Sequence, residues 1–355
     1  MTYSVGMSDL LTHSPAGPVL IVGGYGTVGS TLARLCAPSW PLLLTGRNPA
    51  KGQGLATELG AAVRRWDLNA PEPFSAAPRA IVSTVNDTDD RVVRAAVRAG
   101  IPYVDVTRWT SRMLRAAATA GLLQPTAPVL LSSGWMGGIV NIVAASLSND
   151  LGGARSMEIA IRYDVKDRAG VDSVDFMDRL GQDYEVRRAG ASAMVRPLSD
   201  ARWVNIGAHR TLVARLDTPE QLTLPLTLGV DSVTTRIGFS SNASTRALLA
   251  VKSVGLFRWG SGPRFTGLRR ALLFSPGQGG TAMIRIDAEG PGGNRSVVIT
   301  DPAGQAHLTA LGGYLGLQQV LADDAMAGVT FPESRPDIPG ALAELKTHNV
   351  TVHAA

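Results

Sequence analysis

The feature that most constrains this chain is a glycine-rich run directly after a short apolar segment. Residues 18–23 are apolar and are typical of a buried β-strand, and Gly24-Tyr25-Gly26-Thr27-Val28-Gly29 follows at once. A strand that ends in Gly-x-Gly-x-x-Gly and turns into a helix is how a chain binds the pyrophosphate of a dinucleotide. The spacing therefore predicts a βα unit with a dinucleotide at its turn.

The residues of this run have separate expected roles. Gly24 permits the tight turn, Gly26 lets the backbone approach the pyrophosphate, and Gly29 lets the helix pack against the strand. Thr27 and Val28 open the helix, whose free N–H groups and positive end attract an anion. We expect these five residues to contact the cofactor.

The first 150 residues alternate between apolar segments typical of strands and amphipathic segments typical of helices. Strands are expected at 19–22, 42–45, 62–66, 80–85, 103–106 and 129–131. Repeated βα units with short links predict a doubly wound parallel sheet, the Rossmann arrangement.

The pattern changes after residue 154. Residues 159–165 alternate apolar and polar like a half-buried strand, and 282–288 with 296–300 are typical of a hairpin. A helix is expected through 174–180, whereas 190–275 is poorly patterned. This half is predicted to be α+β, with a mainly antiparallel sheet.

Length allows two domains, since 355 residues can bury two cores. We expect a flexible tail at 1–17, a Rossmann domain at 18–153, an α+β domain at 154–302, a helix that returns to the Rossmann domain at 303–331 and a loose tail at 332–355.

Composition argues against several classes of protein. No run of about 20 apolar residues exists, so no membrane span is expected. The net charge is +5, but the Arg residues are scattered rather than clustered, so no nucleic-acid partner is expected. The single cysteine, Cys36, shares a helical face with Leu32 and Leu35, which predicts a buried thiol and fits a cytoplasmic protein. No cluster of Cys or His predicts a metal site.

The end of the second strand bears on the choice between NAD and NADP. Folds that bind NAD place Asp or Glu there, about 20 residues past the glycines, to hold the ribose hydroxyls. This chain has Thr45-Gly46-Arg47-Asn48 and no acid. The guanidinium of Arg47, beside Asn48, suits an adenosine 2′-phosphate, so NADPH is expected over NADH. The alternative is that Arg47 lies in solvent without a ligand.

Four further residues end strands at the edge where dinucleotides bind. Asp67 follows the third strand and is placed to reach the adenine edge. Thr84, Val85 and Asn86 end the fourth strand, beside the expected central part of the cofactor. An ordinary turn explains these residues equally well.

Several segments together resemble the saccharopine dehydrogenase-like family. They are residues 22–29, 45–48 and 103–106, Gly-Gly-Ile-Val-Asn at 137–141 and Gly-Val-Thr-Phe-Pro-Glu at 328–333. The resemblance implies an NAD(P)-dependent oxidoreductase with a split nucleotide domain and an inserted α+β domain that holds a small-molecule substrate and builds a homodimer. The family usually has Pro-Gly where this chain has Gly137-Gly138, so saccharopine itself is not the expected substrate.

The resemblance further implies hydride transfer to an imine or carbonyl carbon of a small metabolite. Asp105, at the carboxyl end of the fifth strand, is the leading acid/base or orienting group. Alternatively, Asp105 caps the following helix or pairs with Arg108.

Other candidates follow the fifth and sixth strands. Arg108 and Trp109 would hold a substrate carboxylate and an apolar group, and Trp135 and Met136 would shield the nicotinamide ring from water. Tyr163 would donate a proton. Core packing is the alternative for Trp135, Met136 and Tyr163.

Two other functions stay open at this point. A sensor or partner protein that binds NAD(P) without turnover is possible because no unmistakable proton donor stands out. A reductase of a lipid-like substrate is suggested by the apolar run at 247–251.

Overall fold

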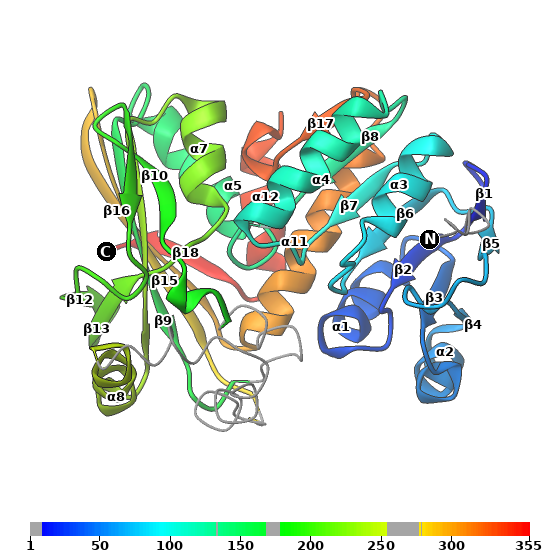
Figure 1. Cartoon of the computed structure of the whole chain (residues 1–355), viewed down its shortest axis with the longest axis horizontal. Helices are drawn as coiled ribbons and strands as arrows, with labels where there is room; N and C mark the ends of the chain where they lie inside the picture. The colour runs from blue at the N-terminus through cyan, green and yellow to red at the C-terminus, as the bar shows by residue number, and fades with distance from the viewer. Residues whose placement is uncertain (1–8, 133, 168–177, 254–276, 278) are drawn as a thin grey trace, which may run out of the picture. The chain divides into compact units, whose positions relative to one another are not determined.

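A computed structural model describes residues 9–132, 134–167, 178–253, 277 and 279–355. The chain forms two compact units, the first from Met1–Ser133 with Thr309–Pro332 and the second from Gly134–Leu308 with Glu333–Ala355. Each unit has its own sheet and its own helices (Figure 1).

The first unit contains a parallel sheet, whose described strands follow the order β17-β8-β7-β6-β2-β3-β4. They are β2 (Val19–Val22), β3 (Leu42–Gly46), β4 (Ala62–Arg65), β6 (Ala80–Ser83), β7 (Tyr103–Asp105), β8 (Pro128–Leu131) and β17 (Gly328–Thr330). Because β3 and β6 flank β2, the strand order reverses there, which confirms the predicted doubly wound sheet. Ligands bind at such a reversal, beyond the carboxyl ends of the strands.

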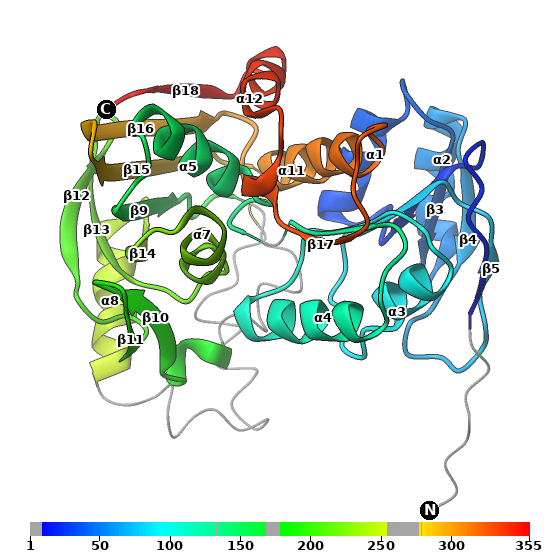
Figure 2. The same ribbon diagram turned by 90° about the horizontal axis from the view of Figure 1, so that it is seen from above.

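Helices cover both faces of this sheet. They are α1 (Thr27–Cys36), α2 (Gln53–Leu59), α3 (Arg91–Arg98), α4 (Thr110–Leu122) and α11 (Gln305–Val320), with the 3₁₀ helix η1 (Pro49–Gly52). Figure 2 shows α3 and α4 on one face and α1, α2 and α11 on the other. Only the part of α11 from Thr309 onward belongs to this unit.

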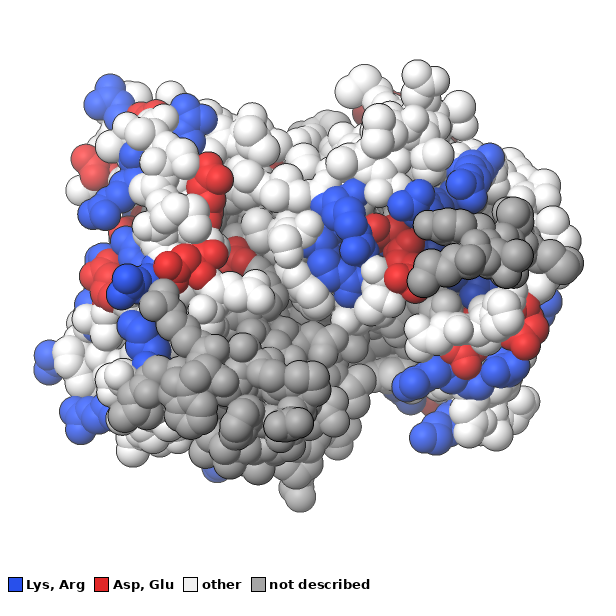
Figure 3. Space-filling model, viewed as in Figure 1, with Lys and Arg blue, Asp and Glu red and all other residues white. Residues whose placement is uncertain are grey.

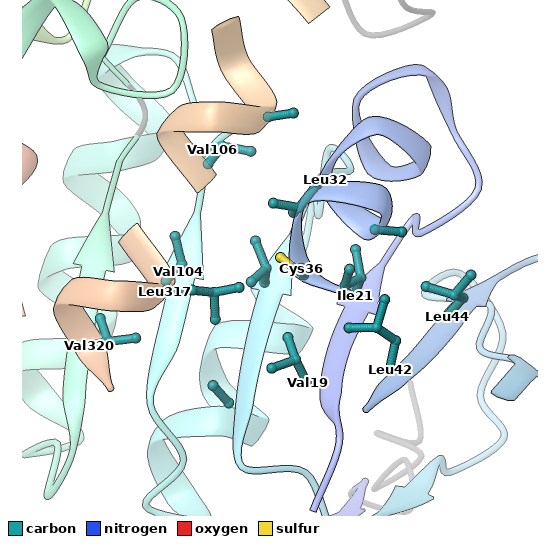
Figure 4. Packing of buried hydrophobic residues seen from close by; sticks show 14 of the residues in the cluster. Val19, Ile21, Leu32, Cys36, Leu42, Leu44, Val104, Val106, Leu317 and Val320 are labelled. Atoms are coloured by element: carbon teal, nitrogen blue, oxygen red, sulfur yellow. The ribbon is translucent and has the colours of Figure 1, made fainter. Parts of the chain in front are cut away.

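The core of the first unit forms where α1 and α11 pack on the sheet. Leu32 and Cys36 of α1 meet Val19 and Ile21 of β2, and Leu317 of α11 joins the same cluster (Figure 4). Cys36 is fully buried, and this burial raises the pKa of its thiol far above the ordinary value. The predicted buried thiol is therefore confirmed.

The second unit contains a mixed sheet, whose described strands follow the order β12-β13-β14-β9-β15-β16-β18. They are β9 (Ser156–Tyr163), β12 (Arg202–Ile206), β13 (His209–Arg215), β14 (Ser232–Phe239), β15 (Ala282–Gly290), β16 (Gly293–Asp301) and β18 (Thr351–Ala354). Only β9 and β14 pair in parallel among these strands, so the sheet is mainly antiparallel, as predicted.

The remaining elements of the second unit are helices and one short hairpin. The helices are α5 (Ile139–Asp150), α7 (Glu220–Leu228), α8 (Asn242–Ser253) and α12 (Ile338–Thr347), with the 3₁₀ helices η2 (Asp178–Gly181) and η4 (Pro332–Ser334). The first residue of η4, Pro332, belongs to the first unit. The strands β10 (Tyr184–Arg188) and β11 (Ala191–Val195) form the hairpin. The helix expected through 174–180 falls mostly on 168–177, outside the described residues.

The described parts of both predicted tails contain regular secondary structure. The segment 332–355 holds α12 and β18, and β18 pairs with β16. Asp337 caps α12 by accepting a hydrogen bond from the Gly340 N–H at 2.8 Å, and Pro339 stands in its first turn, where proline is tolerated. Near the N-terminus, β1 (Leu10–Leu11) pairs with β5 (Ser75–Ala76). The helix α5, placed in the Rossmann domain by the prediction, belongs to the second unit.

On the face in Figure 3, basic side chains lie beside acidic ones. None of the helices in the described ranges has both the length and the apolar composition that crossing a membrane needs.

Candidate functional site

The glycine loop after β2 leaves the start of α1 open. The helix begins at Thr27, and Gly26 precedes it in an extended conformation, with no described side chain capping the first turn. The first N–H groups of a helix have no partner within the helix, so they are available to an anion. Gly26 is exposed, which leaves room for a ligand beside the backbone.

Two glycines of this loop are fixed by close packing. A Cβ on Gly29 would overlap the carbonyl oxygen of Gly23, so the contact between helix and strand requires glycine there, as predicted. The left-handed turn residue is Gly23, with φ of 81°, one residue earlier than the expected Gly24. A Cβ on Gly23 would overlap the side chain of Val85.

Residues at the end of β6 contact the glycine loop and hold its backbone in place. The Thr84 hydroxyl donates hydrogen bonds to the carbonyl oxygens of Val22 at 2.9 Å and Gly23 at 3.3 Å. Asn86 is half-buried just beyond. Asp67 instead closes its own turn, because its carboxylate accepts from the Asn69 N–H at 3.2 Å and from Arg65 at 3.4 Å. Thr84 and Val85 are therefore loop-supporting residues in this structure.

The end of β3 carries two cations. Arg47 and Lys51 are both exposed, and neither side chain forms a hydrogen bond or ion pair with any residue that the structure describes. Asn48 caps η1, since its side chain accepts from the Ala50 N–H at 3.2 Å. The predicted NADP-determining residue is thus accessible, and no acid among the described residues pairs with its charge.

Asp105 lies at the carboxyl end of β7, but it is fully buried in a network of hydrogen bonds. One carboxylate oxygen accepts from the Tyr103 hydroxyl at 2.6 Å and from Nε of Arg108 at 2.7 Å. The other accepts from the N–H and hydroxyl of Thr107, at 3.1 and 3.0 Å. A carboxylate offers about four acceptor sites. The geometry therefore favours the predicted alternative in which Asp105 pairs with Arg108.

Arg108 is the centre of a buried ionic cluster. It binds Asp105, forms a close ion pair with Asp90, and lies 3.9 Å from the Asp87 carboxylate. Burial by itself lowers the pKa of Arg108, but the charge and hydrogen bond of Asp105 together with Tyr103 and Asp90 outweigh burial, so the net shift is upward. Burial raises the pKa of Asp87, whereas Arg115 and Arg108 together lower that of Asp90 despite burial. The guanidinium is thus committed to protein carboxylates, not presented to a substrate.

Asp87 and Asp90 were not among the predicted site residues. Asp87 caps α3 by accepting from the N–H groups of Arg91 at 3.1 Å and Val92 at 2.8 Å. Asp90 adopts a left-handed conformation, with φ of 57°, immediately before α3. The run of acids before a helix was the available signal, but its meeting with Arg108 depends on β6 and β7 being neighbours.

The other predicted substrate residues have structural partners. The Trp109 ring lies under the Arg112 guanidinium at 4.9 Å, and its N–H donates to Ser111 at 3.0 Å. Trp135 packs on a core cluster of the second unit, and its backbone N–H donates to Glu220 at 3.1 Å. Met136 is buried. Residues 247–251 lie in α8, and three of them pack on the same cluster as Trp135.

Tyr163 ends β9 in the second unit. Its ring meets Phe239 edge-on with centroids 5.9 Å apart. Burial, with a contribution from Asp167, raises the pKa of the phenol to about 12. Tyr163 therefore keeps its proton at neutral pH and has no lysine to activate it at the spacing that short-chain dehydrogenases use.

A second cluster of buried polar side chains connects α5, α7 and η4. Asn141 donates hydrogen bonds to Thr223 and Glu333, both at 3.0 Å, and Thr227 donates to Glu333 at 3.1 Å. Glu220 is likewise fully buried. Burial raises the pKa of both carboxyls. These acids were not predicted as a pair, since 333 lies in the stretch taken as a tail.

Comparison with known proteins identifies the fold. Neither a protein-family model nor a curated protein sequence matches the chain. Among solved structures, apo saccharopine dehydrogenase (L-Glu forming) from Saccharomyces cerevisiae is similar with a TM-score of 0.64 at 12% identity, over 96% of this chain and 99% of that chain. A myo-inositol dehydrogenase from Corynebacterium glutamicum aligns with a TM-score of 0.43 at 14% identity, over 96% of this chain and 95% of that one. The chain therefore has the fold of saccharopine dehydrogenase, as the resemblance of its sequence motifs implied.

Proposed function

We propose that this protein is an NADPH-dependent oxidoreductase that transfers a hydride to an imine or carbonyl carbon of a small metabolite. The residues present fit the cofactor. The uncapped start of α1 would bind the pyrophosphate, and Gly26 leaves space beside the backbone for it. When bound, NADPH supplies the hydride. The shared fold of saccharopine dehydrogenase supports this class of reaction.

The observation that carries the choice of NADPH is the free guanidinium at the end of β3. Arg47 is exposed and has no ion pair in the described part of the chain, and no acid stands at the strand end to bind ribose hydroxyls. Arginine binds phosphate through paired, charge-assisted hydrogen bonds. Such an arrangement favours a phosphate over a hydroxyl at the adenosine ribose.

Calorimetric titration of the pure protein with NADPH and with NADH tests this proposal. We expect wild type to bind NADPH at least about tenfold more tightly, which corresponds to roughly 1.4 kcal/mol. Arg47→Ala should remove most of that preference and leave NADH binding unchanged. Arg98→Ala, an exposed arginine in the last turn of α3, is the matched control and should change neither affinity. Equal affinities in wild type would overturn the NADPH assignment.

The reaction is tested by NADPH consumption with a panel of keto acids, each with and without an amine. Consumption that requires the amine supports imine reduction, and consumption without it supports carbonyl reduction.

A non-catalytic NADPH sensor is the second candidate. It is favoured by the state of the two predicted proton donors, because the Asp105 carboxylate is saturated with hydrogen bonds and Tyr163 has a pKa of about 12. Tight NADPH binding with no consumption across the whole panel would support the sensor over the enzyme.

A further inference from the structure

We propose that Tyr25, which lies between Gly24 and Gly26 of the glycine loop, sets the preference for a 2′-phosphate by fixing the segment 46–52. This segment carries both free cations, Arg47 and Lys51. The inference rests on the proposed function, because it concerns the adenosine end of the same cofactor site. Tyr25 is a positioning residue in this proposal and carries no charge itself.

The Tyr25 ring packs against both ends of the segment 46–52 and so braces it. A Cβ added to Gly46 would lie 2.5 Å from the Tyr25 hydroxyl oxygen, and one added to Gly52 would lie 2.5 Å from its Cδ1. Real Cβ atoms do not approach so closely, so the ring fills the space that glycine leaves at each position. The loop that binds pyrophosphate is thereby packed directly against the loop that bears the cations.

The Tyr25 hydroxyl fixes the middle of the same segment. It accepts a hydrogen bond from the Asn48 N–H at 3.1 Å, while the Asn48 side chain accepts from the Ala50 N–H at 3.2 Å. These two backbone donors are therefore already used within the protein. Recognition of a phosphate at this point is left to the side-chain cations rather than to these N–H groups.

Arg47 lies close enough to act on Tyr25. Burial raises the pKa of the Tyr25 phenol, and the hydrogen bond from the Asn48 N–H and, to a smaller extent, the positive charge of Arg47 partly oppose that shift. The phenol stays neutral, so it does not neutralise the guanidinium. A cation on a segment held in place loses less conformational entropy on binding than one on a loose loop, which raises affinity for the group it contacts.

The two loops therefore contribute differently to the binding of the two nucleotides. The N–H groups at the start of α1 serve both nucleotides equally, since both contain the pyrophosphate. The braced segment serves only the nucleotide with the extra phosphate. Loosening the brace should therefore weaken NADPH binding selectively.

Tyr25→Phe tests the hydroxyl while keeping the ring. Calorimetry should show NADPH affinity reduced by about three- to tenfold, the effect of one lost hydrogen bond, with NADH affinity within about twofold of wild type. Tyr314→Phe, a tyrosine of α11 in the same unit, is the matched control and should leave both affinities unchanged.

A second pair of variants tests the ring contact without touching the tyrosine. Gly52→Ala forces the ring aside and should cause the same selective loss for NADPH. Gly54→Ala, two residues further on, is the control, because a Cβ there meets no described atom within 4 Å. Retention of the full wild-type ratio of affinities by both Tyr25→Phe and Gly52→Ala would overturn this inference and leave the proposed function standing. Wild-type protein that binds neither nucleotide would overturn both.

Discussion

Asn141 and Glu333 are 192 positions apart in the chain, yet the Asn141 side-chain amide donates a hydrogen bond to the Glu333 carboxylate at 3.0 Å. Each residue ends one of the two segments, 137–141 and 328–333, that carry part of the resemblance to the saccharopine dehydrogenase-like family. Both lie in the second unit and both are buried. The two motifs therefore meet in the structure, where they form one buried hydrogen bond between α5 and η4.

The pH dependence of stability should report on this contact. Burial raises the pKa of Glu333 above its ordinary value of 4.5. A raised pKa means that the folded state binds the proton more tightly than the unfolded state does, so the stabilisation is complete below about pH 4.5 and is lost as the pH rises through the folded pKa. Glu333→Gln cannot ionise, so its stability relative to wild type should increase from about pH 5 to about pH 8.

Urea unfolding at both pH values measures this difference. Glu58→Gln is the control, since Arg34 lowers the pKa of this exposed carboxyl below its ordinary value of 4.5. Glu58 is therefore ionised at both pH values, and the difference between this variant and wild type should be nearly the same at both. A Glu333→Gln difference that is the same at both pH values would contradict the assignment.

The glycine loop gives a second prediction, with a matched pair of alanine variants. Gly29→Ala puts a Cβ onto the Gly23 carbonyl, so helix α1 must move away from β2. We expect loss of nucleotide binding together with a fall of several degrees in the melting temperature. Gly54→Ala lies within α2 with open space around its Cβ. It should stabilise the protein by up to about 1 kcal/mol, because alanine favours a helix over glycine. Equal melting temperatures for the two variants would contradict the packing described for Gly29.

Sequence alone predicted the first unit well because its signals are local. The buried strand β2 is wholly apolar, and its turn needs glycine for steric reasons that the spacing reveals. Strand β14 is harder to predict, since Thr235 and Arg236 are buried although their residue types are usually found at the surface. Arg236 is buried because it pairs with Glu158 and Asp200, which lie far away along the chain. The hydrophobic pattern of residues 232–239 therefore could not predict these ion pairs.

The same difference between local signals and distant contacts decides which parts of the candidate site could be predicted. The place of Arg47 at the end of β3 could be predicted, because the second strand of such a sheet follows the glycines at a nearly fixed distance. Its role toward a phosphate stays a prediction. The pairing of Asp105 with Arg108 was predicted as an alternative, because the two residues are only three positions apart in the sequence. The convergence of Asp87 and Asp90 on Arg108 was not foreseen, because it needs β6 and β7 side by side.

Breaking the ionic cluster should cost stability before it affects chemistry. Arg108→Met leaves the buried carboxylates of Asp87, Asp90 and Asp105 without their cation, which should lower the free energy of unfolding by about 3–5 kcal/mol. Asp105→Asn should also destabilise, because Arg108 and Tyr103 lose a charged partner. Urea unfolding measures both, with exposed Arg98→Ala as a control near zero. If Asp105→Asn keeps wild-type stability while turnover collapses, Asp105 is the acid/base group after all.

The single thiol offers a direct probe of the α1 packing. Cys36 is fully buried between α1 and the sheet, and burial raises its pKa far above the ordinary value. Since the thiolate is the reactive form, iodoacetamide at about pH 8 should leave the native protein unlabelled over hours and label one site per chain in denaturing urea. Labelling of the native protein must then proceed through opening of α1, so NADPH bound at the start of that helix should slow it further. Rapid native labelling that NADPH leaves unchanged would show that Cys36 is accessible, and the packing of α1 on β2 would have to be abandoned.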